Sequence, residues 1–181
     1  QLSGEIMPAA CSMLDNWETD GFDTTKSYLD NNKFCPGAEG YLFPDTYRFA
    51  EGVPVVQILN AMVERYRAIW TPDRRTRLSD LGMTEREIVT LASIIQAEAR
   101  LEQEMPHISG VFHNRLERGW LLQADPTVTY ALGGYRERLL FAAIDSVADS
   151  PYNTYRRRGL PPGPIGAPGE AAIDAALNPV R

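Results

Sequence analysis

The 181-residue chain contains very little lysine and histidine, and this scarcity limits the chemistry it can perform. Only two lysines, Lys26 and Lys33, accompany sixteen arginines, and both lie near the N-terminus, outside every motif described below. A pyridoxal-phosphate reaction requires a Schiff-base lysine at the site, so the sequence predicts no such cofactor. The histidines, His107 and His113, are six positions apart without an HExxH-type partner, which disfavours a metal site.

Long apolar runs and basic runs are also missing. No apolar stretch reaches the length of a bilayer span, and no signal peptide opens the chain. The net charge is −6 and the longest basic run is residues 156–158, which argues against nucleic acid as a partner, since phosphates attract a concentrated positive face. This arginine run predicts a solvated turn, with contact to an acidic substrate as the alternative.

Cysteine is limited to Cys11 and Cys35, which are separated by 23 residues. A disulfide between them would stabilise the fold by roughly 3 kcal/mol in the chain-entropy description, and only in an oxidising compartment. Two buried thiols are equally compatible with the sequence, so both readings stay open.

The composition, 44% hydrophobic and 23% charged, is typical of a soluble globular protein of about one domain. Residues 1–35 read as an N-terminal arm or the tail of a preceding region, and residues 36–181 as the main domain. Aromatic residues alternate around a Pro-Asp turn in residues 40–49, which predicts a short extended segment. With another short strand near residues 121–123, the expected fold class is α+β, predominantly helical with a few short strands.

Apolar spacing and capping signals predict the helices. Residues 55–70 have helical spacing and end at Thr71-Pro72; a capping box at residues 84–87 starts the next helix near residue 85. Further helices are expected from Pro106 to Gly119, from Asp125 to residues 133–134, around residues 139–147 and over residues 170–177.

One carboxylate stands in an unusual place on the helix that starts near residue 85. Glu98 lies on the same helical face as the apolar stripe and is flanked by Leu91 and Ile94. Partial burial disfavours the charged form of a carboxyl group and raises its pKa, which is how an enzyme keeps a general acid protonated near neutral pH. The alternative is that the helix frays and Glu98 is a solvated surface residue.

Three polar blocks interrupt the apolar pattern. Asn114 and Arg115 break an apolar helix, residues 122–130 combine amide, carboxylate, hydroxyl and phenol groups, and residues 150–165 form a proline-rich loop with Tyr, Asn and Thr. Proline fixes φ and lowers the entropy cost of ordering a loop, and such a stiff polar loop suits carbohydrate. Each block also has a plainer explanation: Asp125 as a helix N-cap, Arg115 and Asn114 as pins for a loop, and the tyrosines as core.

Together with two further segments, these blocks resemble the YceG-like family of endolytic murein transglycosylases, over residues 39 to about 179. The matching segments are EGYLFPDTY (39–47), ASIIQAE (92–98), VFHNRL (111–116), LQADPTV (122–128), and YNTY (152–155) through GLPPGPI (159–165). The resemblance implies a lysozyme-like general-acid helix, a LysM-like region before the catalytic domain, and one N-terminal anchor, absent from this sequence, in the cytoplasmic membrane. It implies location on the outer face of that membrane.

The resemblance also implies the site and partners. The essential glutamate of the family falls on Glu98, and no cofactor is expected. The substrate is expected to be peptidoglycan glycan strands, with cell-wall synthesis enzymes as further candidate partners. The candidate substrate-binding residues are Asn114, Gln123, Asp125, Thr127, Tyr130, Asn153 and Tyr155. The chain departs from the family in two ways: Gln96 stands where many relatives carry a second glutamate, and the sequence stops at Arg181 whereas the family continues.

The expected reaction is cleavage of the β-1,4 bond between N-acetylmuramic acid and N-acetylglucosamine with a 1,6-anhydro product, in which Glu98 acts first as acid and then as base. A lysozyme-like hydrolase with Asp125 as second carboxylate is one alternative. A glycan-binding module without catalysis is the other.

Overall fold

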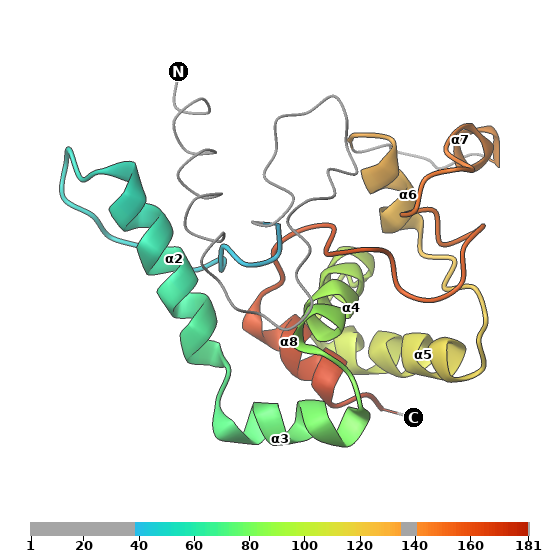
Figure 1. Ribbon diagram of the computed structural model, residues 1–181, viewed down its shortest axis with the longest axis horizontal. Coiled ribbons are helices and arrows are strands. Elements are labelled where there is room, and N and C mark those ends of the chain that lie inside the picture. Colours follow the sequence, from blue (N-terminus) through green and yellow to red (C-terminus); the bar gives the residue numbers. More distant parts are fainter. Residues whose placement is uncertain (1–38, 135–140, 181) are drawn as a thin grey trace. The chain divides into compact units, whose positions relative to one another are not determined.

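The computed structural model describes residues 39–134 and 141–180, and these form two compact units. One ends at Trp70 and the other begins at Thr71. Both are helical in the described residues (Figure 1), with no helix there long and apolar enough to cross a membrane. The boundary expected at residues 35–36, like Cys11 and Cys35, lies outside the described ranges and stays a prediction.

The first unit consists of an irregular segment followed by α2 (Val55–Ile69), which confirms the predicted helix. Tyr66 is fully buried on α2 and lies between two aromatic rings, with centroid distances of 5.2 Å to Tyr41 and 6.2 Å to Trp70. Short strands were expected in the region of residues 36–50, and none forms in its described part, residues 39–50. The Tyr47 hydroxyl donates to the Phe43 carbonyl at 2.8 Å. This local hydrogen bond engages a carbonyl that would otherwise be available for pairing with a neighbouring strand.

The second unit starts with a helix that the sequence analysis missed, α3 (Pro72–Leu81). Its start has ordinary signals, because the Thr71 hydroxyl accepts from the Arg74 N–H at 3.3 Å and Pro72 occupies the first turn. Its end is marked by Gly82 at φ 64°. None of its residues is buried, so apolar periodicity gave no indication of a helix.

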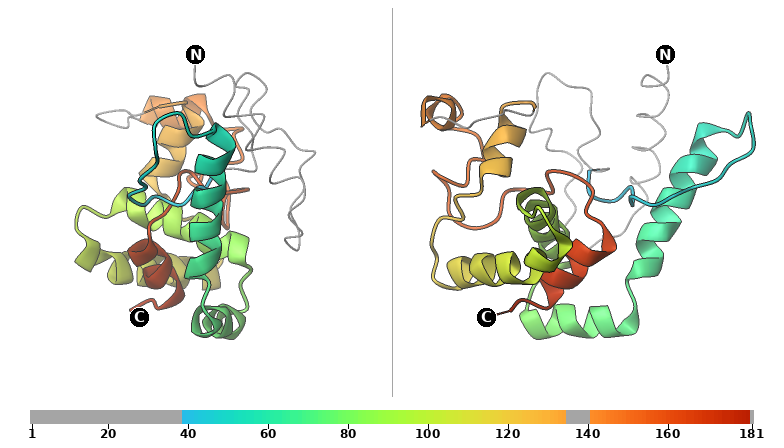
Figure 2. Two further views of the ribbon diagram at one scale, coloured as in Figure 1. Left: turned by 90° about the vertical axis from the view of Figure 1, so that its left-hand side faces the viewer. Right: turned by 180° about the vertical axis from the view of Figure 1, so that it is seen from behind.

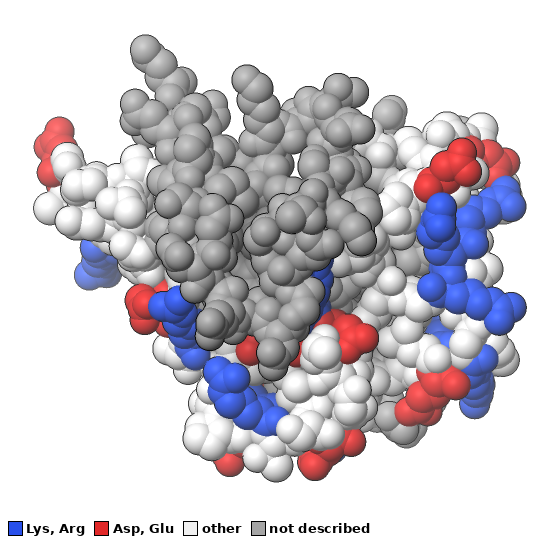
Figure 3. Space-filling view, viewed as in Figure 1, with Lys and Arg blue, Asp and Glu red and all other residues white. Residues whose placement is uncertain are grey.

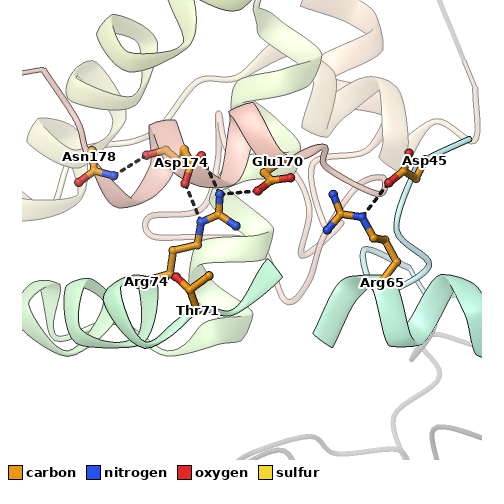
Figure 4. A network of polar contacts seen from close by, with 7 residues as sticks. All are labelled: Asp45, Arg65, Thr71, Arg74, Glu170, Asp174 and Asn178. Carbon is orange, nitrogen blue, oxygen red and sulfur yellow. Dashed lines mark hydrogen bonds and ion pairs between the residues drawn. The ribbon is translucent and has the colours of Figure 1, made fainter. Parts of the chain in front are cut away.

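Polar contacts attach α3 to α8 (Glu170–Leu177). The Arg74 guanidinium donates to both carboxylate oxygens of Asp174, at 2.7 and 2.8 Å, and to Glu170 at 2.8 Å (Figure 4). The Arg77 side chain donates to the Leu177 carbonyl at 2.9 Å. Bidentate, charge-assisted pairs of this kind are the strong class of side-chain hydrogen bonds.

Replacing Arg74 with methionine is expected to lower the free energy of unfolding by about 2 kcal/mol, because the side chain is only 14% exposed and its hydrogen bonds are charge-assisted. Arg75→Met is the matched control, since that side chain is 61% exposed and lies 3.7 Å from Glu85; its effect should stay below about 0.5 kcal/mol. Urea unfolding measures both, and equal midpoints for the two variants would contradict the role assigned to Arg74.

The core of the second unit is formed by α4 (Glu85–Glu98), α5 (Met105–Glu117) and α8, which pack against one another (Figures 1 and 2). The capping box predicted for α4 is confirmed, since Thr84 and Glu87 exchange side chain to backbone hydrogen bonds. Every residue from 88 to 95 is buried. His113 of α5 is also buried, with Nε2 2.8 Å from the Ala176 carbonyl oxygen of α8.

The remaining elements are short: the 3-10 helix η1 (Glu102–Glu104), α6 (Asp125–Ala131) and α7 (Phe141–Ser146). The helices predicted near Pro106, at Asp125 and at residues 170–177 are therefore confirmed, as is part of the one at 139–147. The strand expected at residues 121–123 is reduced to a single antiparallel bridge between Leu121 and Arg158. A strand cannot continue here for two reasons. The Arg115 side chain donates to the Leu122 carbonyl, and Gln123, at φ 52°, lies outside the β region of backbone conformations. The prediction of a predominantly helical fold is thus confirmed for the described residues, but the few short strands of the expected α+β class do not form there.

Candidate active site

Glu98 is the last residue of α4 and its side chain is half-buried. It follows eight consecutive buried residues, so the packing of α4 against the core fixes where this carboxyl group lies. Burial is the main cause of the raised pKa of Glu98. The predicted position on the edge of the apolar face is confirmed, and the alternative of a fully solvated side chain is wrong.

Asp125 and Arg115 act on the Glu98 carboxyl group with opposite signs. After burial, the negative charge of Asp125 is the next cause that raises the pKa of Glu98. A hydrogen bond from the Asp125 backbone N–H and the positive charge of Arg115 lower the pKa. The carboxyl group thus has a donor and a cation near it for its charged form, while burial favours its neutral form. This balance suits a group that gives and then takes a proton.

The plainer explanation of Asp125, that it is the N-cap of α6, is wrong. The N-cap is Ala124, Asp125 is the first helical residue, and no side-chain cap is present. The Asp125 carboxylate accepts a hydrogen bond from the Tyr155 hydroxyl. Burial, this hydrogen bond and the charges of Asp125 and Glu98 raise the pKa of Tyr155 to about 12, so its hydroxyl stays a donor throughout the neutral range. Glu98, Asp125 and Tyr155, far apart in sequence, therefore lie together.

Gln123 is the non-glycine residue with a positive φ, 52°, among the residues that the structure describes. Its two neighbours are held firmly, because Leu122 and Ala124 are fully buried. The Gln123 N–H donates to the Thr154 carbonyl at 3.1 Å and the Ala124 N–H to the Thr154 hydroxyl at 3.0 Å. The surrounding structure therefore imposes this conformation and leaves the Gln123 side chain exposed. Strain of this kind, maintained by its surroundings, is frequent at functional sites.

Two predicted substrate-binding residues are buried and engaged within the protein. The fully buried Asn153 amide donates to the Ile144 and Val147 carbonyls at 2.9 and 3.0 Å, and its oxygen accepts from the Tyr155 N–H at 3.1 Å. The Thr127 hydroxyl, also fully buried, donates to the Ala124 carbonyl at 2.8 Å. The structure corrects these assignments: both side chains shape the loop beneath the site and do not face a substrate.

Asn114 and Tyr130 are half-buried and therefore stay candidates. The Tyr130 ring lies 4.8 Å from that of Tyr152, centroid to centroid, at a tilt of 46°. For Arg115, the next residue, the alternative that it holds a loop in place is confirmed, because its guanidinium group donates to the Leu122 carbonyl. Its charge also acts on Glu98, so Arg115 belongs to the site although the sequence analysis did not select it.

Thr154 was likewise missed, although it organises the loop that carries Gln123. Its buried hydroxyl lies 2.8 Å from that of Thr127 and accepts from the Ala124 N–H. The available signal was its place between Asn153 and Tyr155, both of which were selected.

The proline-rich loop is fastened to α4 by side chains of that helix. Ser93 accepts from the Ile165 N–H at 3.1 Å, and Arg86 donates to the Pro162 carbonyl at 2.6 and 3.1 Å. Gln96 accepts from the N–H of Gly169, the N-cap residue of α8, at 2.7 Å. Position 96 thus serves the loop before α8, whereas position 98 faces Asp125. This division explains in physical terms why an amide is tolerated at position 96.

No group of three or more His, Cys, Asp or Glu side chains suited to a metal ion occurs within residues 39–134 and 141–180. The described site brings together one half-buried carboxyl group, a neighbouring carboxylate, a phenol and a guanidinium group.

Fold and site define a helical domain in which one glutamate with a raised pKa ends a buried helix beside a short polar helix and a stiff loop. The chain belongs to the YceG-like family, which it matches over residues 9–181.

The chain is similar to the endolytic murein transglycosylases of Bacillus subtilis and Streptococcus pneumoniae. It is 35% identical to the first over 158 residues, which is 87% of this chain and 43% of the relative. It is 34% identical to the second, strain D39, over 146 residues, which is 79% of this chain and 26% of the relative. The chain thus spans less than half the length of either relative.

A crystal structure of a YceG-like protein from Listeria monocytogenes has the same fold. The TM-score is 0.77 at 35% sequence identity, and the match covers 96% of this chain and 55% of the other.

Proposed function

We propose that this chain carries the catalytic part of a lytic transglycosylase that cleaves peptidoglycan glycan strands endolytically. The observation that carries the proposal is the half-buried Glu98, whose pKa is raised by burial and which lies beside Asp125. Family membership and the similarity to two proteins named endolytic murein transglycosylase support it.

In the proposed reaction, protonated Glu98 gives its proton to the glycosidic oxygen between N-acetylmuramic acid and N-acetylglucosamine, and the bond from C1 to that oxygen breaks. The C6 hydroxyl of the same muramic acid attacks C1, and its proton passes to the Glu98 carboxylate. Protons balance, Glu98 returns to its starting form, and the product ends in a 1,6-anhydro sugar. One carboxyl group suffices, in contrast to the paired carboxylates of most glycosidases. In this role α4 is the counterpart of a lysozyme general-acid helix.

The other residues of the site position the substrate and tune Glu98. Gln123 presents an exposed amide on a backbone held by Thr154, and Tyr155, held by Asp125, presents a phenol. Asn114 and Tyr130 are further candidates for contact with the sugars. Arg115 holds the Gln123 loop through the Leu122 carbonyl and supplies positive charge while Glu98 is ionised.

Mass spectrometry of purified glycan strands after incubation with the chain tests the proposal. Anhydro-muramyl ends are expected. Reducing ends would overturn the transglycosylase in favour of a hydrolase that uses Asp125 and water. Binding of strands without cleavage would point to a glycan-binding module.

Asp125→Asn is expected to move the alkaline limb of the pH profile of kcat/KM to lower pH. The free enzyme needs protonated Glu98, so activity is lost as pH rises through the pKa of Glu98. The negative charge of Asp125 raises that pKa, and its removal lowers it. Asp149→Asn, at an exposed carboxylate in the loop after α7, is the control and should leave the limb in place. A limb that stays fixed or moves to higher pH in Asp125→Asn would contradict the coupling.

For the whole protein, the proposal places the activity on the outer face of the cytoplasmic membrane, with a single N-terminal anchor and a LysM-like region before the catalytic domain at residues 36–181. Peptidoglycan strands are the proposed substrate, and wall-synthesis enzymes are candidate partners. Protease access to the full-length protein in spheroplasts tests the location: protection would contradict it.

A further inference from the structure

Trp120, the third residue after the end of α5, presents an indole that is 56% exposed. Its backbone is fixed, because the Trp120 N–H donates to the Arg115 carbonyl at 2.8 Å and the Gly119 N–H to the Leu116 carbonyl at 3.0 Å. With Gly119 at φ 64°, this pattern is a Schellman motif. The exposed ring is thus held by an ordered helix end.

Arg118 lies over this ring, with its guanidinium carbon 5.0 Å from the ring centroid. A cation–π contact orients the guanidinium group but leaves its N–H donors available to an anion. Among the described residues, no acceptor for the Arg118 side chain is found.

The neighbouring arginines are engaged differently. In Figure 3, Lys and Arg side chains gather along the edge at the right of the view, where Figure 1 places the end of α5 and the loop after α7. In that loop, Arg156 pairs with Asp145, and Arg157 donates to the Asp149 and Ser150 carbonyls at 3.0 and 3.2 Å. Arg156 thus ties the loop to α7 and Arg157 holds the loop itself, whereas Arg118 is oriented by the exposed aromatic ring.

The pair is continuous with the candidate active site. Gln123 lies three positions after Trp120, a span of at most about 11 Å between Cα atoms. The Arg115 carbonyl accepts from Trp120, while its side chain holds the Leu122 carbonyl and its charge acts on Glu98. The bridge between Leu121 and Arg158 ties the same segment to the loop that carries Tyr155.

We propose that Trp120 and Arg118 form a subsite for a muramyl residue of the same glycan strand, outside the site of cleavage. The apolar CH face of the sugar stacks on the exposed part of the indole. In a muramyl residue whose peptide has been removed, the free lactyl carboxylate pairs with the Arg118 guanidinium group. This inference rests on the proposed function, since it assumes that the strand passes Glu98. The subsite would let the chain distinguish a peptide-free murein strand from a neutral polymer of N-acetylglucosamine.

The test compares two ligands of equal length. One is a glycan strand stripped of its peptides by an amidase, which leaves a carboxylate on every muramyl residue; the other is a neutral chito-oligosaccharide. Titration calorimetry on the 181-residue chain carrying Glu98→Gln measures binding without cleavage. Trp120→Ala is expected to weaken binding of both ligands about tenfold. Arg118→Gln is expected to weaken binding of the strand about threefold at low salt and to leave the neutral ligand unchanged.

Arg157→Gln is the control, because it removes the same charge from a side chain whose hydrogen bonds, within residues 39–134 and 141–180, go to carbonyls of its own loop. Its affinities should match those of the parent chain. Equal affinities for parent and Trp120→Ala, or equal losses for both ligands in Arg118→Gln, would overturn the subsite. Anhydro products from the chain with Glu98 intact, alongside such a result, would leave the proposed function standing. A chain that neither binds nor cleaves strands would overturn both.

Discussion

Glu98→Gln is expected to slow cleavage of glycan strands by about 10²- to 10⁴-fold, the usual contribution of general acid and base catalysis. Glutamine has nearly the same shape but can neither give a proton to the glycosidic oxygen nor accept one from the C6 hydroxyl. Because the Asp125 backbone N–H and Arg115 remain, binding of the strand should change little. Rates of release of anhydro-muramyl ends, measured by mass spectrometry at several strand concentrations, separate kcat from KM.

The same substitution is expected to stabilise the fold at neutral pH. The pKa of Glu98 is raised in the folded state by burial and by Asp125, so the carboxyl group favours the folded state most at low pH. This contribution is lost as pH rises through the raised pKa. Glutamine does not ionise, and the variant should therefore match the parent at low pH and exceed its unfolding free energy near pH 7.

Glu102→Gln is the matched control for both effects. Glu102 is an exposed glutamate four positions beyond Glu98, in η1, and no shift of stability or activity is expected for its variant. Normal turnover in Glu98→Gln would refute the assignment of Glu98. Lost turnover together with lost stability at neutral pH would point to a structural role instead.

The helices of the core could be predicted from sequence because burial and capping impose a readable pattern. The eight buried residues of α4 and its capping box gave both the start of the helix and the partial burial of Glu98. By contrast, α3 buries none of its residues and is attached through Arg74, so its only signals were Thr71, Pro72 and Gly82. A helix that is attached to a distant helix through polar side chains shows no apolar periodicity in its sequence.

The kinds of side chain in the site could be predicted from the sequence, but the direction in which each side chain points could not. Sequence reasoning selected residues by polarity, and polar side chains that organise a loop have the same composition as those that contact a ligand. Asn153 and Thr127 were therefore placed with Tyr155, although their hydrogen bonds turn inward. Arg115, in contrast, belongs to the site but was not selected. Its contact with the Leu122 carbonyl spans seven residues and depends on the turn at Gly119.

Gln123→Gly is expected to separate stability from activity. A non-glycine residue at φ 52° is strained by about 1–2 kcal/mol, and glycine adopts this conformation freely. The variant should thus be more stable than the parent, or equal to it once the greater entropy of unfolded glycine is counted. Gln123→Ala should show no such relief, since alanine meets the same strain.

Both variants of Gln123 remove its exposed side-chain amide, which is carried by a backbone segment that hydrogen bonds to Thr154 hold in place. If this amide orients the strand, each should lower kcat/KM by about 10²-fold, the loss expected when a positioning contact to a substrate is removed. Thermal unfolding and rates of anhydro-product release, measured on the same preparations, give the comparison. Equal activity losses with a higher midpoint in Gln123→Gly would show that the strain serves to position the glutamine side chain. Full activity in both variants would mean that the conformation at residue 123 serves the loop alone, and that Tyr155 and Asn114 carry the contact with the sugars.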